Sequence, residues 1–190
     1  MQHVTSPTVP TSFPLPHFPT PEPPAPLVPS PIQQTDSQQQ LLEFVKRLCH
    51  RFHAVARQLR LRGEYRSTLA VEDEFDIQDL LYALLRLQFD DIGTDEWTPS
   101  YAEGLPRTTF LLDQNRLAIV AKKTRPGLSA KDLADQFRVD ADRYRAKHGC
   151  GTLLCFVYDP EGRVGNPRGL ETDHSTTSTH FTIDVLVAPK

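Results

Sequence analysis

The chain has 190 residues with a formal net charge of −3, and 24% of its residues are charged. This length allows one domain of ordinary size and a tail, and the small net charge points to no particular partner. No run approaches the roughly 20 apolar residues that span a bilayer, so we expect no membrane association.

The N-terminal segment, residues 1–36, is rich in proline. Eleven of the 17 prolines fall within residues 1–31. Proline lacks a backbone donor and fixes φ, which opposes helix and sheet. We therefore expect a disordered, partly polyproline-II tail. It has neither the positive start nor the apolar run of a signal peptide. The three cysteines have no paired spacing, which favours a reducing, cytoplasmic location.

Residues 37–62 are predicted to form one helix within a basic segment that spans 37–66. Apolar residues repeat at alternating steps of four and three from Leu41 to Leu59, the spacing of a heptad seam. The polar side carries seven Lys and Arg against two acids between residues 41 and 66. The seam over 41–59 suits self-association or a protein partner, and the basic side suits phosphate contacts. An ordinary packed helix with a solvated face would show the same pattern.

A second helix is predicted over 72–87, with acids in its first turn, where the helix dipole favours them. Asp76 and Asp79 are three apart and share a face. Both suit helix capping, and both suit a site beside the next elements. A long connection over 90–106 follows. Two strands are then expected at about 107–113 and 116–123, joined by a tight turn.

A third helix is predicted over 129–147, with Ser129 as its N-cap and Asp132 in a capping box. Strands are expected at 152–158 and 181–187. The loop at 165–169 has spaced glycines but is not a phosphate-binding loop, since no Gly-Lys-Ser/Thr and no helix are expected after it. The order of elements over 67–190 predicts an α/β domain with a small mixed sheet flanked by helices.

The predicted hairpin at 107–123 has the layout of a nuclease metal site. Magnesium needs hard oxygen ligands, usually carboxylates, and phosphodiester cleavage also needs a cation near the attacking water or the developing charge. A hairpin can supply an acid on its first strand, and an acid and a lysine two apart on its second, all on one face. Lys122 occupies the lysine position.

Several long strings give this chain a family resemblance. They are Glu-Phe-Asp-Ile-Gln-Asp-Leu-Leu (74–81), Phe-Asp-Asp-Ile (89–92), Glu-Trp-Thr-Pro-Ser-Tyr (96–101), Lys-Lys-Thr-Arg (122–125), Gly-Leu (127–128), Cys-Phe-Val-Tyr-Asp-Pro-Glu-Gly-Arg (155–163) and Gly-Asn-Pro-Arg-Gly-Leu (165–170). The chain resembles the PD-(D/E)XK nuclease superfamily, in particular the DpnII/MboI-like restriction endonuclease domains of bacterial defence proteins. The resemblance implies a restriction-endonuclease-like core.

The resemblance assigns the catalytic positions one by one. The family's aspartate on the first hairpin strand falls on Thr109, and its Glu-X-Lys motif falls on Val120 and Lys122. Asp76 or Asp79 matches the acid on the preceding helix and would be the metal ligand of a working site. Gln136 and Tyr144 match a glutamine and a tyrosine that recur on the following helix in related nucleases.

The two substitutions predict a catalytically impaired domain. Threonine offers one neutral oxygen and valine offers none, so we expect no bound cofactor, or Mg²⁺ if the site works. The leading hypothesis is binding of nucleic acid or a partner in a bacterial defence or regulatory system. One alternative is an active Mg-dependent DNA endonuclease with a carboxylate relocated to Asp132 or Asp135. Another is an adaptor acting through the heptad helix and tail. The cations expected to contact nucleic acid are Lys122, Lys123, Arg125, Arg107, Arg163 and Arg168.

Overall fold

The computed structural model describes residues 31–60, 69–97, 107–147 and 149–190, with the backbone alone for residues 31–36 and 107. Residues 1–30 of the expected tail over 1–36 lie outside the described residues, and residues 31–36 form the start of a helix where the tail was expected. No helix in these ranges is both long and apolar enough to cross a membrane. All three cysteines are buried and unpaired.

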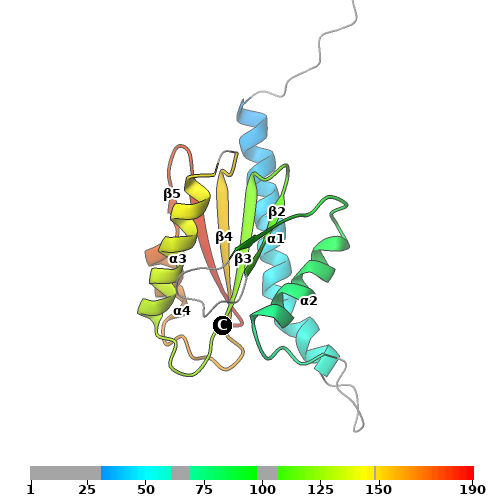
Figure 1. Cartoon of the computed structure of the whole chain (residues 1–190), viewed down its shortest axis with the longest axis vertical. Coiled ribbons are helices and arrows are strands. Elements are labelled where there is room, and N and C mark those ends of the chain that lie inside the picture. The colour runs from blue at the N-terminus through cyan, green and yellow to red at the C-terminus, as the bar shows by residue number, and fades with distance from the viewer. Residues whose placement is uncertain (1–30, 61–68, 98–106, 148) are drawn as a thin grey trace, which may run out of the picture.

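The centre of the fold is a mixed six-stranded sheet in the order β1-β2-β3-β4-β6-β5 (Figure 1). Strands β3, β4 and β6 are mutually parallel, and the other neighbours pair antiparallel. The strands are β1 (Gly93–Trp97), β2 (Arg107–Leu112), β3 (Leu117–Lys123), β4 (Thr152–Tyr158), β5 (Thr176–Thr177) and β6 (Thr182–Ala188). The C-terminal ends of the parallel strands therefore lie at one common edge of the sheet, and the segments that follow these strands begin there.

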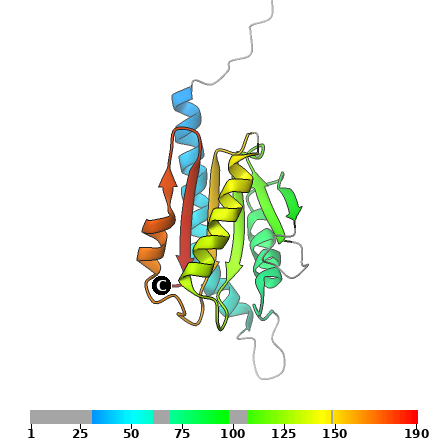
Figure 2. The same cartoon turned by 60° about the vertical axis from the view of Figure 1, so that its left-hand side comes forward.

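Four helices cover the two faces of the sheet. Helix α1 (Pro31–Arg60) and α2 (Glu74–Arg86) lie on one face, and α3 (Ala130–Arg145) and α4 (Pro167–His174) lie on the other. Figure 2 shows α3 in front of the sheet and α1 behind it. The predicted α/β class, a small mixed sheet flanked by helices, is confirmed.

Alternation along the strands divides the core into two clusters. Phe110, Ile119 and Phe156 face α1 and α2. Their strand neighbours Val120 and Cys155 face α3 and α4, because successive side chains in a strand point to opposite faces. β4 is buried at every position, as expected for a strand covered on both sides.

The predicted heptad seam of α1 packs against this sheet. Val45 and Phe52 are fully buried, and the Phe52 ring lies 5.5 Å from the Phe156 ring and 5.0 Å from the Tyr158 ring. Because its apolar side is occupied within the chain, the seam is not free for self-association in this structure. Helix α1 is thus a packed element of the same core.

Three elements were not anticipated, and the short strand β5 is one of them. Residues 93–97 form the edge strand β1 where a connection was expected. Pro167–His174 form α4 directly after the glycine-rich loop, with Asn166 as its N-cap, so the expectation that no helix follows this loop was wrong. Pro at the first helical turn fits α4 because its missing donor is not needed there. The capping box of Ser129 and Asp132 on α3 is confirmed.

Candidate functional site

Thr109 and Val120 lie in one row across the sheet, and Lys122 lies two positions further along the same strand as Val120. Asp95 of β1 is paired with Thr109 of β2, and Phe110 is paired with Ile119 of β3. This register places Thr109 next to Val120, and strand alternation places Lys122 on the same face, toward α3. Thr109, Val120 and Lys122 therefore lie on one face of the sheet. An acid on β1 that the sequence reasoning did not include, Asp95, lies beside them.

Helix α3 covers this row with a polar stripe. Gln136, Asp140 and Tyr144 follow each other at intervals of four, so they share one face of the helix. All three are buried. Leu133, Phe137 and Ala141 form a neighbouring stripe on the same helix. This stripe supplies the apolar contact of α3 with the sheet.

Lys122 is held by the central residue of that stripe. Its Nζ lies 2.6 Å from Asp140 Oδ2, and both side chains are only 1% exposed. Buried charges persist in a protein when they are paired, and this pair brings together β3 and α3. The ammonium group is therefore inaccessible to solvent and already matched by a carboxylate.

Asp95 and Tyr144 occupy the space beside Thr109. The Tyr144 hydroxyl donates to Asp95 Oδ2 at 2.9 Å, and burial raises the pKa of the phenol, so it remains protonated. Thr109 is fully buried beside Tyr144. The phenol of Tyr144 therefore covers Thr109, the position to which the family resemblance assigned the strand acid.

Asp95 is also the centre of an ion cluster on the outer half of α3. Arg143 and Lys147 each lie 2.8 Å from its Oδ2, and the Arg143 guanidinium lies 4.7 Å from the Trp97 ring centre. Burial raises the pKa of Asp95, but the hydrogen bonds from Lys147, Arg143 and Tyr144 outweigh it and hold the pKa below its usual value. Asp95 thus fastens the edge strand to α3.

Of the two roles expected for Asp76 and Asp79, Asp76 takes the helix-capping one. Asp76 Oδ2 accepts from the backbone N–H groups of Glu72 and Asp73 and completes the capping box of α2. Asp79 is exposed. Helix α2 packs on the sheet face opposite Asp140, so the structure does not bring either acid to the buried Lys122 pair.

The cations expected to contact nucleic acid are unequally available. Lys122 is buried, so it cannot reach a phosphate in this structure. Lys123 Nζ and Arg163 Nε lie 3.6 and 3.8 Å from Glu161 oxygens. Arg125 and Arg168 are exposed and form no ion pair within the described ranges. The side chain of Arg107 lies outside the described residues.

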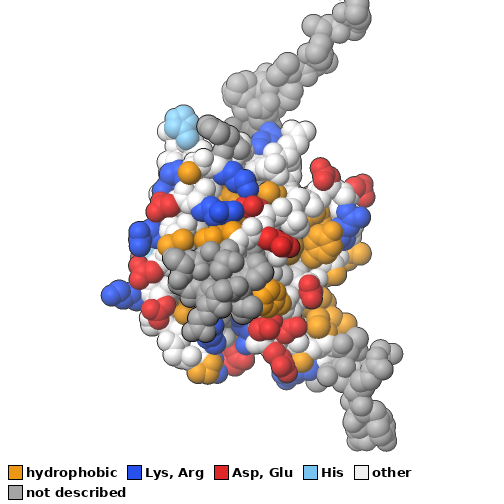
Figure 3. Space-filling model, viewed as in Figure 1, with side chains coloured by type: hydrophobic (Ala, Val, Ile, Leu, Met, Phe, Trp, Pro, Cys, Tyr) orange, Lys and Arg blue, Asp and Glu red, His pale blue; other side chains and the backbone are white. Residues whose placement is uncertain are grey.

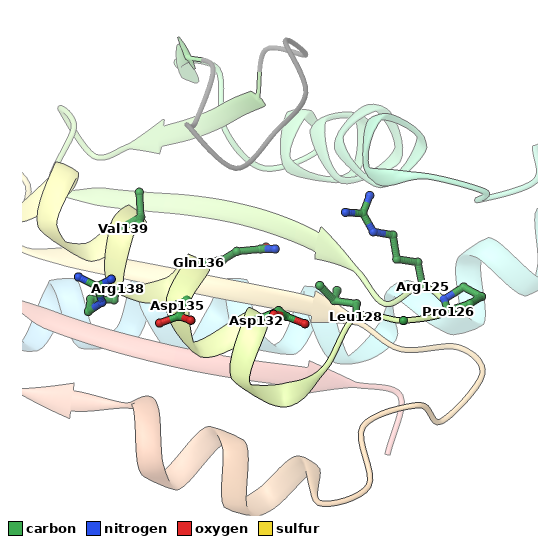
Figure 4. A pocket seen from close by; sticks show the side chains of 9 residues that line it. Arg125, Pro126, Leu128, Asp132, Asp135, Gln136, Arg138 and Val139 are labelled. Carbon is green, nitrogen blue, oxygen red and sulfur yellow. The ribbon is translucent and has the colours of Figure 1, made fainter.

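A groove of about 670 Å³ lies beside α3 at the end of β3. Figure 4 shows the Gln136 amide extending from α3 toward the end of the strand, with Arg125 on the segment beyond it. Gln136 is 8% exposed, and its Oε1 has no hydrogen-bond partner in the described structure. Asp132, Asp135 and Arg138 also line the groove. Its charges are balanced, and its free polar group is the glutamine amide.

The sequence model of the DpnII-MboI restriction endonucleases, REase_DpnII-MboI, matches residues 43–190. The chain belongs to the DpnII-MboI restriction endonuclease family. The predicted family is thereby confirmed. The match begins inside α1, in agreement with the packing of that helix on the sheet. Neither the curated proteins nor the solved structures gave a match.

Members of the DpnII-MboI family usually use Mg²⁺, and the acids beside Lys122 and Thr109 are both engaged by other side chains here. No group of three or more His, Cys, Asp or Glu side chains gathers within the described ranges. Asp140 is the carboxylate beside Lys122, and that lysine already neutralises it. Asp95 is engaged by Arg143 and Tyr144 of α3 and by Lys147, which follows that helix.

Two residues of this DpnII-MboI site were missed by sequence reasoning. Asp140 stands four residues from both Gln136 and Tyr144, so helical spacing alone could have placed it between them. Asp95 carried no such signal, because its segment has no alternating apolar pattern. The predicted Gln136 and Tyr144 do lie on the same face of α3 as Asp140.

Proposed function

We propose that this chain is a DpnII-MboI family domain that binds DNA without cleaving it, in a bacterial defence or regulatory system. The main observation behind this proposal is the buried ion pair of Lys122 and Asp140 beside Thr109 and Val120. Metal-assisted hydrolysis needs a bound ion, an activated water and stabilised charge together. None of these three requirements is supplied by a neutral threonine, a valine and a lysine that is already paired with Asp140.

DNA binding is supported by the family and by the groove at the end of β3. Arg125 is exposed without an ion pair in the described structure, and Gln136 offers an unpartnered amide oxygen. Arginine suits phosphate oxygens, and a glutamine amide can donate to and accept from a base edge. Such contacts need no catalytic metal.

The test is a cleavage and binding assay on plasmid and short duplexes with Mg²⁺ or Mn²⁺. Lys122→Ala would leave Asp140 buried and unpaired, so the lysine-free control is Lys122→Met/Asp140→Leu, which preserves an apolar packing. We expect neither protein to cut DNA and both to bind it, with affinity falling steeply as salt rises. Cleavage by the unmodified protein that disappears in the double variant would overturn the proposal.

A second candidate function is an active Mg-dependent endonuclease with a relocated carboxylate. It is favoured by the acid on α3 that lies next to Lys122, which is Asp140 and neither Asp132 nor Asp135. Asp132 is instead engaged with Ser129 at the start of α3. If this candidate holds, Asp140→Asn abolishes a cleavage activity that the unmodified protein shows.

A further inference from the structure

Helix α1 carries a line of basic side chains along one flank, three of them Lys or Arg and two of them His. Lys46, His50, His53, Arg57 and Arg60 follow at steps of four, three, four and three, so they share one stripe of the helix surface. We call these five residues the basic stripe. It runs for about 21 Å at 1.5 Å per residue. The apolar seam lies beside it and holds α1 on the sheet.

Two contacts with strands of the sheet fix the position of the basic stripe. Lys46 Nζ lies 2.8 Å from Asp184 Oδ2 of β6, and His53 Nδ1 lies 2.9 Å from the Tyr158 hydroxyl of β4. The remaining members are exposed, and Arg57 and Arg60 form no ion pair within the part of the chain described. The cations are therefore presented from a rigid support.

A groove of about 390 Å³ lies at the C-terminal end of the stripe. His53, Arg57 and Arg60 line one side, and Tyr158 and Glu161 line the other. Glu161 already contacts Lys123 and Arg163, so the two arginines remain in excess. Whichever of the His53–Tyr158 pair donates to the other, the pair keeps a further N–H or O–H donor.

Other surfaces near the sheet's common edge are less suited to phosphate. The groove at the start of α2 is lined by Glu72, Asp73 and Glu74 beside Lys123 and Arg125. Figure 3 shows acidic side chains below the centre of that face. The Gln136 groove balances two arginines with two aspartates. Because these acids repel a polyanion, the basic stripe is a more favourable surface for a polyanion than either of these grooves.

We propose that the basic stripe of α1 and its terminal groove bind the phosphate backbone of DNA. This rests on the proposed function and places its main electrostatic contact on the sheet face opposite Lys122. Arg57 and Arg60 supply the unpaired positive charge of the stripe within the described residues, since Lys46 is paired with Glu43 and Asp184. Contacts to a phosphate backbone require charge and register but no base-specific geometry. The groove seats one phosphate between Arg57, Arg60 and the His53–Tyr158 pair.

The experiment measures binding of the full chain to a labelled DNA duplex over a salt series. Arg57→Gln/Arg60→Gln removes two exposed charges of the stripe. Arg47→Gln/Arg51→Gln removes two exposed charges from another side of α1 and is the matched control. We expect the stripe variant to bind about tenfold more weakly and to lower the salt slope by about two, and the control to change little. Unchanged unfolding curves verify the fold.

Three outcomes would overturn the inference. If Arg125→Gln weakens binding and the stripe variant does not, the inference fails while DNA binding stands. If the control weakens binding as much as the stripe variant, net charge and not the stripe is responsible. If AMP alone competes as effectively as duplex of equal phosphate concentration, the groove is a nucleotide site. Absence of any binding by the unmodified protein contradicts the proposed function itself.

Discussion

Lys122 Nζ and Asp140 Oδ2 lie 2.6 Å apart, with both side chains 1% exposed. The pair joins β3 to α3, the helix that covers it, and keeps both charged groups away from solvent. Its burial is the physical reason to regard Lys122 as a structural residue here.

Breaking this pair on one side should strongly destabilise the domain. Lys122→Met leaves a buried carboxylate without its partner, and we expect a loss of about 3–5 kcal/mol in the free energy of unfolding. Lys122→Met/Asp140→Leu should lose far less, because both charges are removed. Urea unfolding of the full chain measures both. Arg145→Gln, which breaks an exposed pair with Asp142, should stay within about 0.5 kcal/mol. Equal losses in the single and double variants would contradict the assignment.

Asp95 should make stability depend on pH in the acid range. Its pKa is lowered in the folded state, so its contribution is complete above the ordinary aspartate value of about 3.9 and is lost as pH falls through the folded value. Asp95→Asn should therefore be less stable than the unmodified protein at pH 6. The difference should shrink toward pH 3. Thermal unfolding across this range tests it, and a difference that stays constant would exclude the ion cluster as the cause.

Magnesium should not stabilise this protein. A ligand that binds only the folded state raises the unfolding temperature more as its concentration rises above its Kd, and no group of three or more His, Cys, Asp or Glu gathers within the described ranges. Thermal unfolding with and without about 10 mM Mg²⁺ at matched ionic strength should give the same midpoint. A concentration-dependent rise that is absent in Asp140→Asn would support the relocated-carboxylate candidate instead.

The acids at the start of α2 should act on stability and not on any metal chemistry. Asp73 accepts from the backbone N–H groups of Phe75 and Asp76, and we expect Asp73→Ala to cost about 0.5–2 kcal/mol. Asp79→Ala, on the same helix but exposed, is the control and should change little. Urea unfolding distinguishes the two. An Asp79→Ala effect as large as that of Asp73→Ala would show that capping is not the relevant difference.

Phe52 should be as important to the sheet as the sheet's own residues. It is fully buried against Phe156 and Tyr158, so Phe52→Ala should cost about 3–5 kcal/mol in a single unfolding transition. Arg51→Ala, one position away and exposed, should lie within about 0.5 kcal/mol. A separate early transition for α1 in either protein would show that the helix is not part of the common core.

The fold was readable from the sequence where local patterns are strong. Strand alternation placed Val120 and Lys122 on one face, and Ser129 marked the start of α3. The heptad seam favoured packing of α1 against another helix, but the same pattern serves a helix or a sheet as partner. Only the tertiary structure decided that the partner is the sheet.

The missed elements lacked such patterns. β1 reads Gly-Thr-Asp-Glu-Trp and becomes a strand through its pairing with β2. α4 buries only Leu170, so it shows no helical periodicity. The closure of the site by Asp95 depends on β1, and that contact could not be foreseen while β1 was taken as a connection.

The contact of Lys46 with Asp184 spans 138 positions of the chain. During synthesis, α1 leaves the ribosome long before β6 exists, and its apolar seam has no complete sheet to cover until the last strand is made. Domains fold as units, and contacts of such separation form late. A chain ending before residue 182 would therefore lack the contacts of α1 with β6, so we expect the C-terminal strand to complete the packing of α1 on the sheet.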